Sequence, residues 1–116
     1  MNLKVYGIKN CDTMKKAFTF LDEKGVSYDF IDYKKQKPSA ELLNSFLEKT
    51  PLASLVNKQG TTYKKMEDTQ KAALENAETA LPILMENSSM IKRPVIVYPD
   101  GSVTLGFVPD QIEKKI

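Results

Sequence analysis

The pattern of apolar and polar positions changes period twice within the first third of the chain. Residues 3–8, "LKVYGI", form a short apolar run that passes into polar residues, as a buried strand does where it enters a loop. From Asp12 the apolar residues return at helical spacing, and Gly25 is a suitable end for that helix. Residues 26–33, "VSYDFIDY", alternate again. The pattern predicts a strand, a helix and a second strand.

The middle of the chain has helical periods separated by polar loops. Ser39 can cap a helix that places Leu42, Leu43, Phe46 and Leu47 on one face. Residues 57–66, "NKQGTTYKKM", are expected to form an exposed loop with a turn at Gly60. Two further short helices are expected, one over 69–76 and one from about Thr79 with Pro82 in its first turn.

The last quarter of the chain predicts a β-hairpin and a short helix. Residues 93–107, "RPVIVYPDGSVTLGF", place a Pro-Asp-Gly turn between two strands, and Pro109 stands near the start of a final helix. The order of elements predicts a single α/β domain over residues 1–116. We expect a thioredoxin-like fold, with a helical subdomain inserted between the βαβ unit and the hairpin at about 39–91.

Composition and charge restrict the class of protein. The chain has 116 residues, 41% hydrophobic and 28% charged, which is typical of a single globular domain. We expect no membrane partner and a cytoplasmic location, because no apolar run approaches the ~20 residues of a membrane span and the first residues lack the apolar core of a signal peptide. The basic residues are scattered and the net charge is only +2, so we expect no direct contact with nucleic acid.

The chain has one cysteine, Cys11, and no histidine. An internal disulfide, a cysteine and histidine zinc site, and catalysis by Cys-His or Ser-His-Asp are therefore excluded, and we expect no metal. Cys11 lies in the predicted strand-to-helix turn, where free N–H groups favour an anion and can lower a thiol pKa from ~8.5 to roughly 3.5–7.5. Lys9, Lys15 and Lys16 add positive potential, and Asp12 opposes it. A buried structural cysteine is the alternative, but the polar turn favours a nucleophile.

Met14 stands where a dithiol oxidoreductase would have its second cysteine. The chain therefore cannot resolve its own mixed disulfide, so an external thiol such as glutathione does this, or the site is not an oxidoreductase. As an ordinary residue, Met14 fits the apolar face of the helix.

Arg93 is the only arginine among 17 basic residues and precedes Pro94. We hypothesise a cis bond between them, which would bring Arg93 beside Cys11. Arginine offers rigid paired donors to a carboxylate or an oxyanion, and lysine does not. A surface arginine is the alternative. The lysines and the tyrosine of residues 57–66 could likewise form a cationic lip for glutathione or another acidic partner, or simply a solvated loop.

Three motifs, "YGIKNCDTMKKA", "LVNKQGTTYKKM" and "MIKRPVIV", resemble the arsenate reductase-like family, which also contains the Spx and MgsR regulators. Within the family the chain is most similar to the YffB branch of probable glutathione-dependent thiol reductases. The resemblance implies a thioredoxin-like fold, a nucleophile at Cys11 and an anion-binding arginine at Arg93. We expect the substrate site to include Asn10, Asp12, Thr13, Lys15 and Pro94.

The chain differs from members of the family at positions that distinguish their activities. Glutaredoxin-linked arsenate reductases resemble it but surround the cysteine with three arginines, and here Asn57 and Val108 stand near the places of the other two. Spx-type regulators often carry a Cys-x-x-Cys switch, which Met14 breaks. We therefore expect a glutathione-dependent thiol-disulfide oxidoreductase that acts on a glutathionylated or disulfide substrate, with glutathione as co-substrate and no bound cofactor. The alternatives are a glutaredoxin-linked arsenate reductase and a noncatalytic, Spx-like regulator that binds RNA polymerase.

Overall fold

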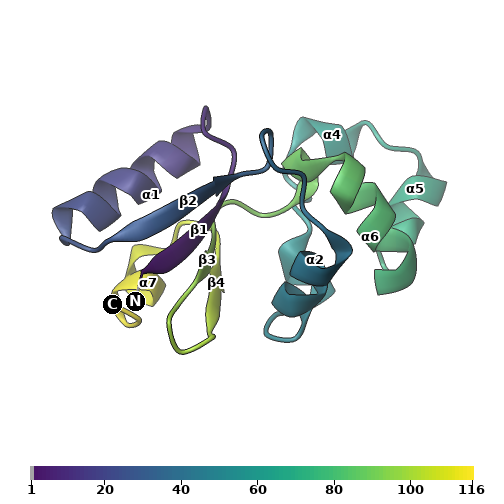
Figure 1. The fold of residues 1–116 in the computed structure, drawn as a ribbon. Helices are drawn as coiled ribbons and strands as arrows, with labels where there is room; N and C mark the ends of the chain where they lie inside the picture. Colours follow the sequence, from purple (N-terminus) through teal and green to yellow (C-terminus); the bar gives the residue numbers. More distant parts are fainter. Residues whose placement is uncertain (1) are drawn as a thin grey trace. The chain divides into compact units, whose positions relative to one another are not determined.

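The computed structural model describes residues 2–116, and their contacts divide the chain into two compact units (Figure 1). One unit combines the chain up to Gln36 with Arg93–Ile116, and the other is Lys37–Lys92. The sequence predicts a helical insertion over about 39–91, within a single domain. The first unit contains every strand of the described sheet, together with Cys11 and Arg93.

A four-stranded sheet forms the centre of the first unit, with strand order β2-β1-β3-β4. Its strands are β1 (Leu3–Gly7), β2 (Tyr28–Asp32), β3 (Val95–Val97) and β4 (Val103–Leu105). β1 pairs in parallel with β2, whereas β1 with β3 and β3 with β4 are antiparallel. The predicted βαβ unit and hairpin are therefore confirmed, and the two lie side by side because β1 is hydrogen-bonded to both β2 and β3.

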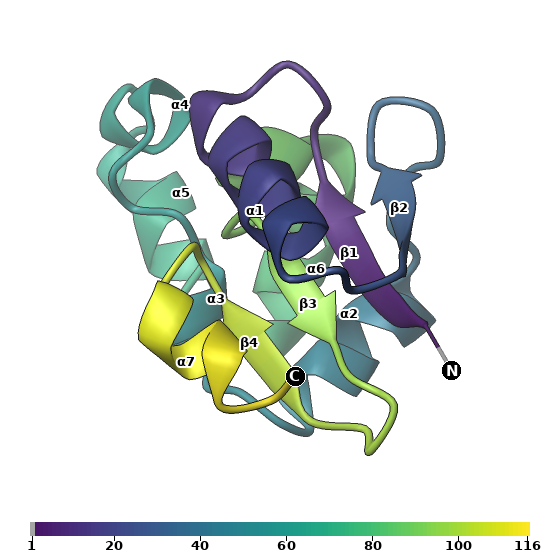
Figure 2. The same cartoon turned by 90° about the vertical axis from the view of Figure 1, so that its left-hand side faces the viewer.

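Two helices cover one face of this sheet, α1 (Asp12–Glu23) and α7 (Pro109–Glu113) (Figure 2). Val5 of β1 and Ile96 of β3 are register partners, and both side chains are fully buried against the helices. Met14 and Leu21 contribute the buried stripe of α1, and Ile112 that of α7. Full burial of one such side chain is worth about 1.5–3 kcal/mol, so this cluster holds α1, and with it Cys11, against the sheet.

The ends of these elements follow the local chemistry of the chain. Gly25 adopts φ +69° just after α1, a conformation that favours glycine. Gly101 adopts φ +88° in the hairpin turn, where its N–H donates to the Tyr98 carbonyl at 2.9 Å. Pro109 is in the first turn of α7, where a missing N–H costs nothing.

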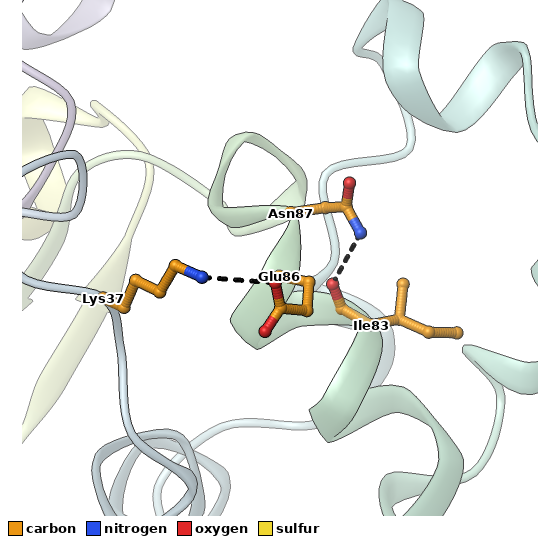
Figure 3. A network of polar contacts seen from close by, with 4 residues as sticks. All are labelled: Lys37, Ile83, Glu86 and Asn87. Carbon is orange, nitrogen blue, oxygen red and sulfur yellow. Dashed lines mark hydrogen bonds and ion pairs between the residues drawn. The ribbon is translucent and has the colours of Figure 1, made fainter.

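The second unit consists of short helices. They are α2 (Ala40–Leu47), α3 (Leu52–Leu55), α4 (Thr61–Lys64), α5 (Asp68–Ala73), α6 (Ala77–Glu86) and a 3₁₀ turn, η1 (Ser88–Met90). Ser39 caps α2 as predicted, since its hydroxyl accepts the Leu42 N–H at 3.1 Å. At the end of α6 the Asn87 side chain donates to the Ile83 carbonyl at 3.0 Å, and Lys37 lies 3.2 Å from Glu86 (Figure 3).

Two local predictions for this unit were wrong. Residues 57–66 are not wholly a loop, because α4 forms within them with Gly60 at its N-cap. The last long helix begins at Ala77 rather than near Thr79, so Pro82 lies inside α6 and not in its first turn. Asn76 determines that start, since its side chain accepts the Glu78 N–H at 2.9 Å, and an asparagine cap is stronger than the signal from proline.

Candidate active site

Cys11 is the N-cap residue of α1. Its backbone is extended, with φ −132° and ψ 131°, and its carbonyl accepts the Lys15 N–H at 3.0 Å as the first hydrogen bond of the helix. The side chain is half-buried and is the one free thiol of the chain. Because the first N–H groups of a helix have no partner within it, this position exposes the sulfur to their positive ends.

The pKa of the Cys11 thiol is lowered. Desolvation by partial burial acts to raise it, but the backbone N–H groups of Met14 and Thr13, the charge of Arg93 and the Thr13 hydroxyl together outweigh that effect. The thiol makes no well-formed cap hydrogen bond to the helix, so we assign the effect to stabilisation of the thiolate by these nearby donors. A thiolate is the nucleophilic form of cysteine, so the position favours reactivity.

Arg93 and Pro94 enter the site from the start of β3. The peptide bond between them is cis, in agreement with the hypothesis from the sequence. Arg93 is half-buried and supplies the positive charge that lowers the Cys11 pKa, whereas Pro94 is buried. The Pro94 carbonyl accepts the Gly106 N–H at 2.9 Å, which ties the segment before β3 to the loop after β4.

Met14 is a core residue, as its place on the helix predicts. It is fully buried and packs onto β1 at Gly7. A Cβ added to Gly7 would lie 2.5 Å from Met14 Sδ and 2.6 Å from Met14 Cε, so a side chain there would require the thioether to move. The position that could hold a resolving thiol is thus filled by an apolar side chain, while its backbone N–H faces the nucleophile.

The other residues expected at the substrate site surround Cys11 at different depths. Asn10, Asp12 and Lys15 are exposed. Thr13 is half-buried, and its backbone N–H and its hydroxyl both favour the Cys11 thiolate. Asp12 occupies the first turn of α1, where a carboxylate suits the helix dipole.

A hollow of about 280 Å³ opens where the loop before Cys11 meets the end of β2. Lys9 and Lys35 contribute cations to it and Asp32 a carboxylate, and its remaining lining residues are Phe30, Ile31 and Gln36. The hollow can therefore accept an anionic group beside an apolar wall.

The cationic segment expected to form a lip belongs to the second unit. Lys71 lies 5.2 Å from the centre of the Tyr63 ring, and Lys58 is 3.8 Å from Glu75. The Asn57 N–H donates to the Met90 carbonyl at 2.6 Å, and in the first unit Val108 is exposed at 41%. A role for the lip stays a prediction, and neither Asn57 nor Val108 supplies a cation.

Sequence reasoning missed the part played by Phe107. Phe107 contacts Phe20 of α1 edge to face, with ring centres 5.8 Å apart, directly after Gly106 at φ +77°. The signal that could have identified it is the pattern Gly-Phe-Val-Pro. A turn glycine before the aromatic residue and a helix-starting proline after it indicate that the ring lies in a loop between strand and helix, where it must pack against another element.

Residues 2–116 contain neither a side-chain cluster suited to a metal ion nor a membrane-spanning helix. No group of three or more His, Cys, Asp or Glu side chains is placed to hold a metal ion. No helix in that range is both long and apolar enough to cross a membrane.

The fold and the site define a protein with the thiol oxidoreductase fold of arsenate reductase-like proteins, in which a helix begins at a cysteine and a cis proline precedes the hairpin. The chain belongs to the ArsC family, whose model matches residues 6–115. It is 37% identical to an uncharacterized protein of Haemophilus influenzae over 90% of each chain.

Solved structures agree with this assignment. The YFFB (PA3664) protein is 40% identical, covers 98% of each chain and superposes with a TM-score of 0.91. An arsenate reductase related protein from Brucella melitensis is 42% identical over 98% of this chain and 93% of its own, with a TM-score of 0.78. The family and the thioredoxin-like fold predicted from the three motifs are therefore confirmed.

Proposed function

We propose that the protein is a thiol-disulfide oxidoreductase that uses Cys11 as its nucleophile and glutathione as the resolving thiol. The observation that supports this is the place of Cys11, the only cysteine of the chain, at the N-cap of α1, where the N–H groups of the first turn and the charge of Arg93 lower the pKa of its thiol. A reactive thiolate without an internal partner can attack a disulfide but needs another thiol to release it.

The reaction has two exchange steps. The Cys11 thiolate attacks a glutathionylated substrate at the glutathione sulfur, a new S–S bond forms, and the substrate leaves as a thiolate. A glutathione thiolate then attacks the mixed disulfide, which releases oxidised glutathione and restores the Cys11 thiolate. In sum, the substrate sulfur is reduced to a thiol and one free glutathione is oxidised, leaving as a disulfide with the glutathione that came from the substrate.

Three sets of groups near Cys11 support the binding of the two carboxylates and the sulfur of glutathione. Arg93, which acts on the Cys11 thiolate, can hold a carboxylate through paired hydrogen bonds. Lys9 and Lys35 in the hollow beside the loop suit the second carboxylate. The Thr13 and Met14 N–H groups stabilise the sulfur whenever it is a thiolate, both before attack and as a leaving group.

The test is turnover of a small glutathione mixed disulfide in the presence of glutathione. We expect turnover by the parent protein and none by Cys11→Ser. With oxidised glutathione alone, mass spectrometry of the intact protein should find one glutathione per chain, since there is no second cysteine to eject it. A folded protein that neither turns over the disulfide nor forms this adduct would refute the proposal.

Arsenate reduction is a second candidate, which the 42% identity to the arsenate reductase related protein favours. Arg93 is the one arginine available to an arsenate oxyanion, so we expect this activity to be weak. An assay with arsenate, glutathione and glutaredoxin decides between the two. Arsenate turnover faster than disulfide turnover would reverse the order of the candidates.

A further inference from the structure

A shallow groove of about 390 Å³ lies along the outer side of α1, where this helix meets the loop between β4 and α7. Its lining residues are Lys15, Lys16, Thr19, Phe20, Glu23 and Phe107. Both aromatic rings are half-buried, and they meet edge to face at an interplanar angle of 74°. The Phe20–Phe107 groove, as we call it, therefore has an aromatic floor with charged side chains along its edge.

Both sides of this groove are joined to the candidate active site by backbone hydrogen bonds. On one side the Lys15 N–H donates to the Cys11 carbonyl at 3.0 Å. On the other, Phe107 follows Gly106, whose N–H donates to the Pro94 carbonyl at 2.9 Å. Backbone hydrogen bonds therefore link residues at the groove to Cys11, which carries the thiol, and to the cis proline, Pro94.

The charges of the groove are separated along its length. Within residues 2–116, no ion pair engages Lys15 or Lys16, and both side chains are exposed near the Cys11 end. Glu23 lies at the opposite end of α1. The neighbouring Lys24 is already engaged, 2.9 Å from Glu113 and 5.5 Å from the centre of the Phe20 ring. An acidic group is therefore complementary to the end nearer the thiol.

We propose that the Phe20–Phe107 groove binds an extended segment of a protein substrate, next to the substrate cysteine that Cys11 attacks. The segment has an acidic residue toward Cys11 and an aromatic or aliphatic residue beyond it. This inference rests on the proposed function for its sulfur chemistry, and it names the class of substrate: protein disulfides or glutathionylated proteins with acidic and apolar residues beside the cysteine.

The geometry of a helix gives the spacing of this pattern. Lys15 lies about 6 Å and Phe20 about 14 Å beyond Cys11 along the helix axis, at 1.5 Å per residue. An extended chain rises about 3.3 Å per residue, so the acidic residue stands about two positions, and the apolar residue about four positions, from the substrate cysteine.

Binding is tested without thiol chemistry by using the Cys11→Ser protein. Peptides with the pattern Ser-Gly-Glu-Gly-Phe, in both chain directions, are titrated into isotope-labelled protein and followed by amide chemical shifts. We expect saturable shifts at the groove residues for at least one direction. A matched peptide with lysine in place of glutamate, and another with serine in place of phenylalanine, should each bind roughly fivefold more weakly, since each lacks one of the two proposed contacts.

Protein variants test the two contacts separately. The double variant Lys15→Glu, Lys16→Glu should weaken binding about tenfold, because the single acidic residue of the peptide then meets two carboxylates in place of two ammonium groups. Lys49→Glu changes an exposed lysine of the other unit and should leave affinity unchanged. Phe107→Ala should weaken binding, whereas Val108→Ser, at an exposed apolar neighbour outside the groove, should not. Thermal melts of every variant control for folding.

The outcomes separate this inference from the proposed function. Absence of saturable binding in both chain directions, or binding that ignores the groove variants, would overturn the groove as a substrate site. Turnover of the small glutathione disulfide by the parent protein would remain in that case. Selective peptide binding without any such turnover would support the groove and overturn the thiol chemistry.

Discussion

The packing of Met14 on Gly7 can be tested by a double-mutant cycle. Gly7 does not have a positive φ, so alanine there meets no backbone strain, but its Cβ would lie 2.5 Å from Met14 Sδ. The thioether must therefore shift by nearly 1 Å inside a fully buried site, and such overpacking costs about 1–3 kcal/mol. Met14→Ala alone should cost about 2–5 kcal/mol through the cavity that it leaves.

The two changes should compensate each other in the double variant. The methyl group introduced by Gly7→Ala then enters space that Sδ and Cε have left, so this substitution should cost close to nothing in the Met14→Ala background. We expect a coupling free energy of about 1–3 kcal/mol in the stabilising direction. Gly25→Ala is the matched control, because its Cβ would meet nothing within 4 Å and its cost comes from φ +69° alone. That cost should be the same with and without Met14.

Urea unfolding measures these free energies. The chain has five tyrosines and no tryptophan, so far-UV circular dichroism and tyrosine fluorescence are the two probes, and coincident transitions justify a two-state treatment. A Gly7→Ala penalty that is equal in both backgrounds would refute the claim that Met14 is what excludes a side chain at Gly7.

Three other predictions follow from the site and the core. Arg93→Gln should raise the pKa of Cys11, so the midpoint of its alkylation rate should move to higher pH than in the parent, while Arg93→Lys keeps part of the effect. Equal midpoints would show that Arg93 does not act on the thiolate. Lys9→Gln should raise the KM for glutathione several-fold with little change in kcat, and an unchanged KM would exclude the hollow as a carboxylate site. Tyr33→Phe should raise the free energy of unfolding by about 1 kcal/mol, because its buried hydroxyl has no hydrogen-bond partner among residues 2–116. Tyr98→Phe should lower the free energy of unfolding by a similar amount, because its hydroxyl is hydrogen-bonded to that of Thr104 at 2.8 Å. The reverse order of the two variants would contradict this reasoning.

The lowered pKa of Cys11 also determines how the stability of the fold changes with pH. A thiol with a lower pKa in the folded state binds its proton less tightly there than in the unfolded chain. Its contribution to stability is therefore fully present above the unfolded pKa of ~8.5 and is lost as the pH falls through the lowered folded value. Cys11→Ser removes this contribution and serves as its control.

The first unit could be predicted from the sequence because its signals are strong and agree with one another. A period of 3.6 from Met14 to Leu21 predicts α1, and Gly25 and Gly101 stand at turns that need positive φ. The position of Cys11 at the helix start follows from these elements, since the strand before it and the helix after it leave only a short turn between them.

The second unit was harder because its helices are short. α3 and α4 have four residues each, and a single turn cannot show a period. α5 begins with a capping box between Glu67 and Gln70, which the apolar pattern does not reveal. Pro82 was expected in a first turn, but position alone does not say whether a helix extends upstream of a proline.

The Phe20–Phe107 contact could not be predicted from the sequence for a different reason. The two residues are far apart in the sequence and are brought together by tertiary packing alone, with Gly106 directing the loop after β4. Likewise, the need for glycine at Gly7 arises from the volume of Met14 and not from the backbone. No pattern along the chain shows which side chains will share one space.

The absence of histidine and the presence of Met14 at the second thiol position both agree with a single thiolate that is stabilised without a general base. A cysteine that depends on a neighbouring base needs a histidine, and a dithiol mechanism needs a second sulfur at the position of Met14. Here the thiolate is instead favoured by groups that do not take part in proton transfer: two backbone N–H groups, one hydroxyl and the charge of Arg93. Such a site favours the thiolate without a base, and in the proposed mechanism the release of the bound sulfur is left to a thiol from solution. In that mechanism the identity of the thiol should be determined by the proposed carboxylate-binding groups around Cys11 rather than by any second sulfur of the protein.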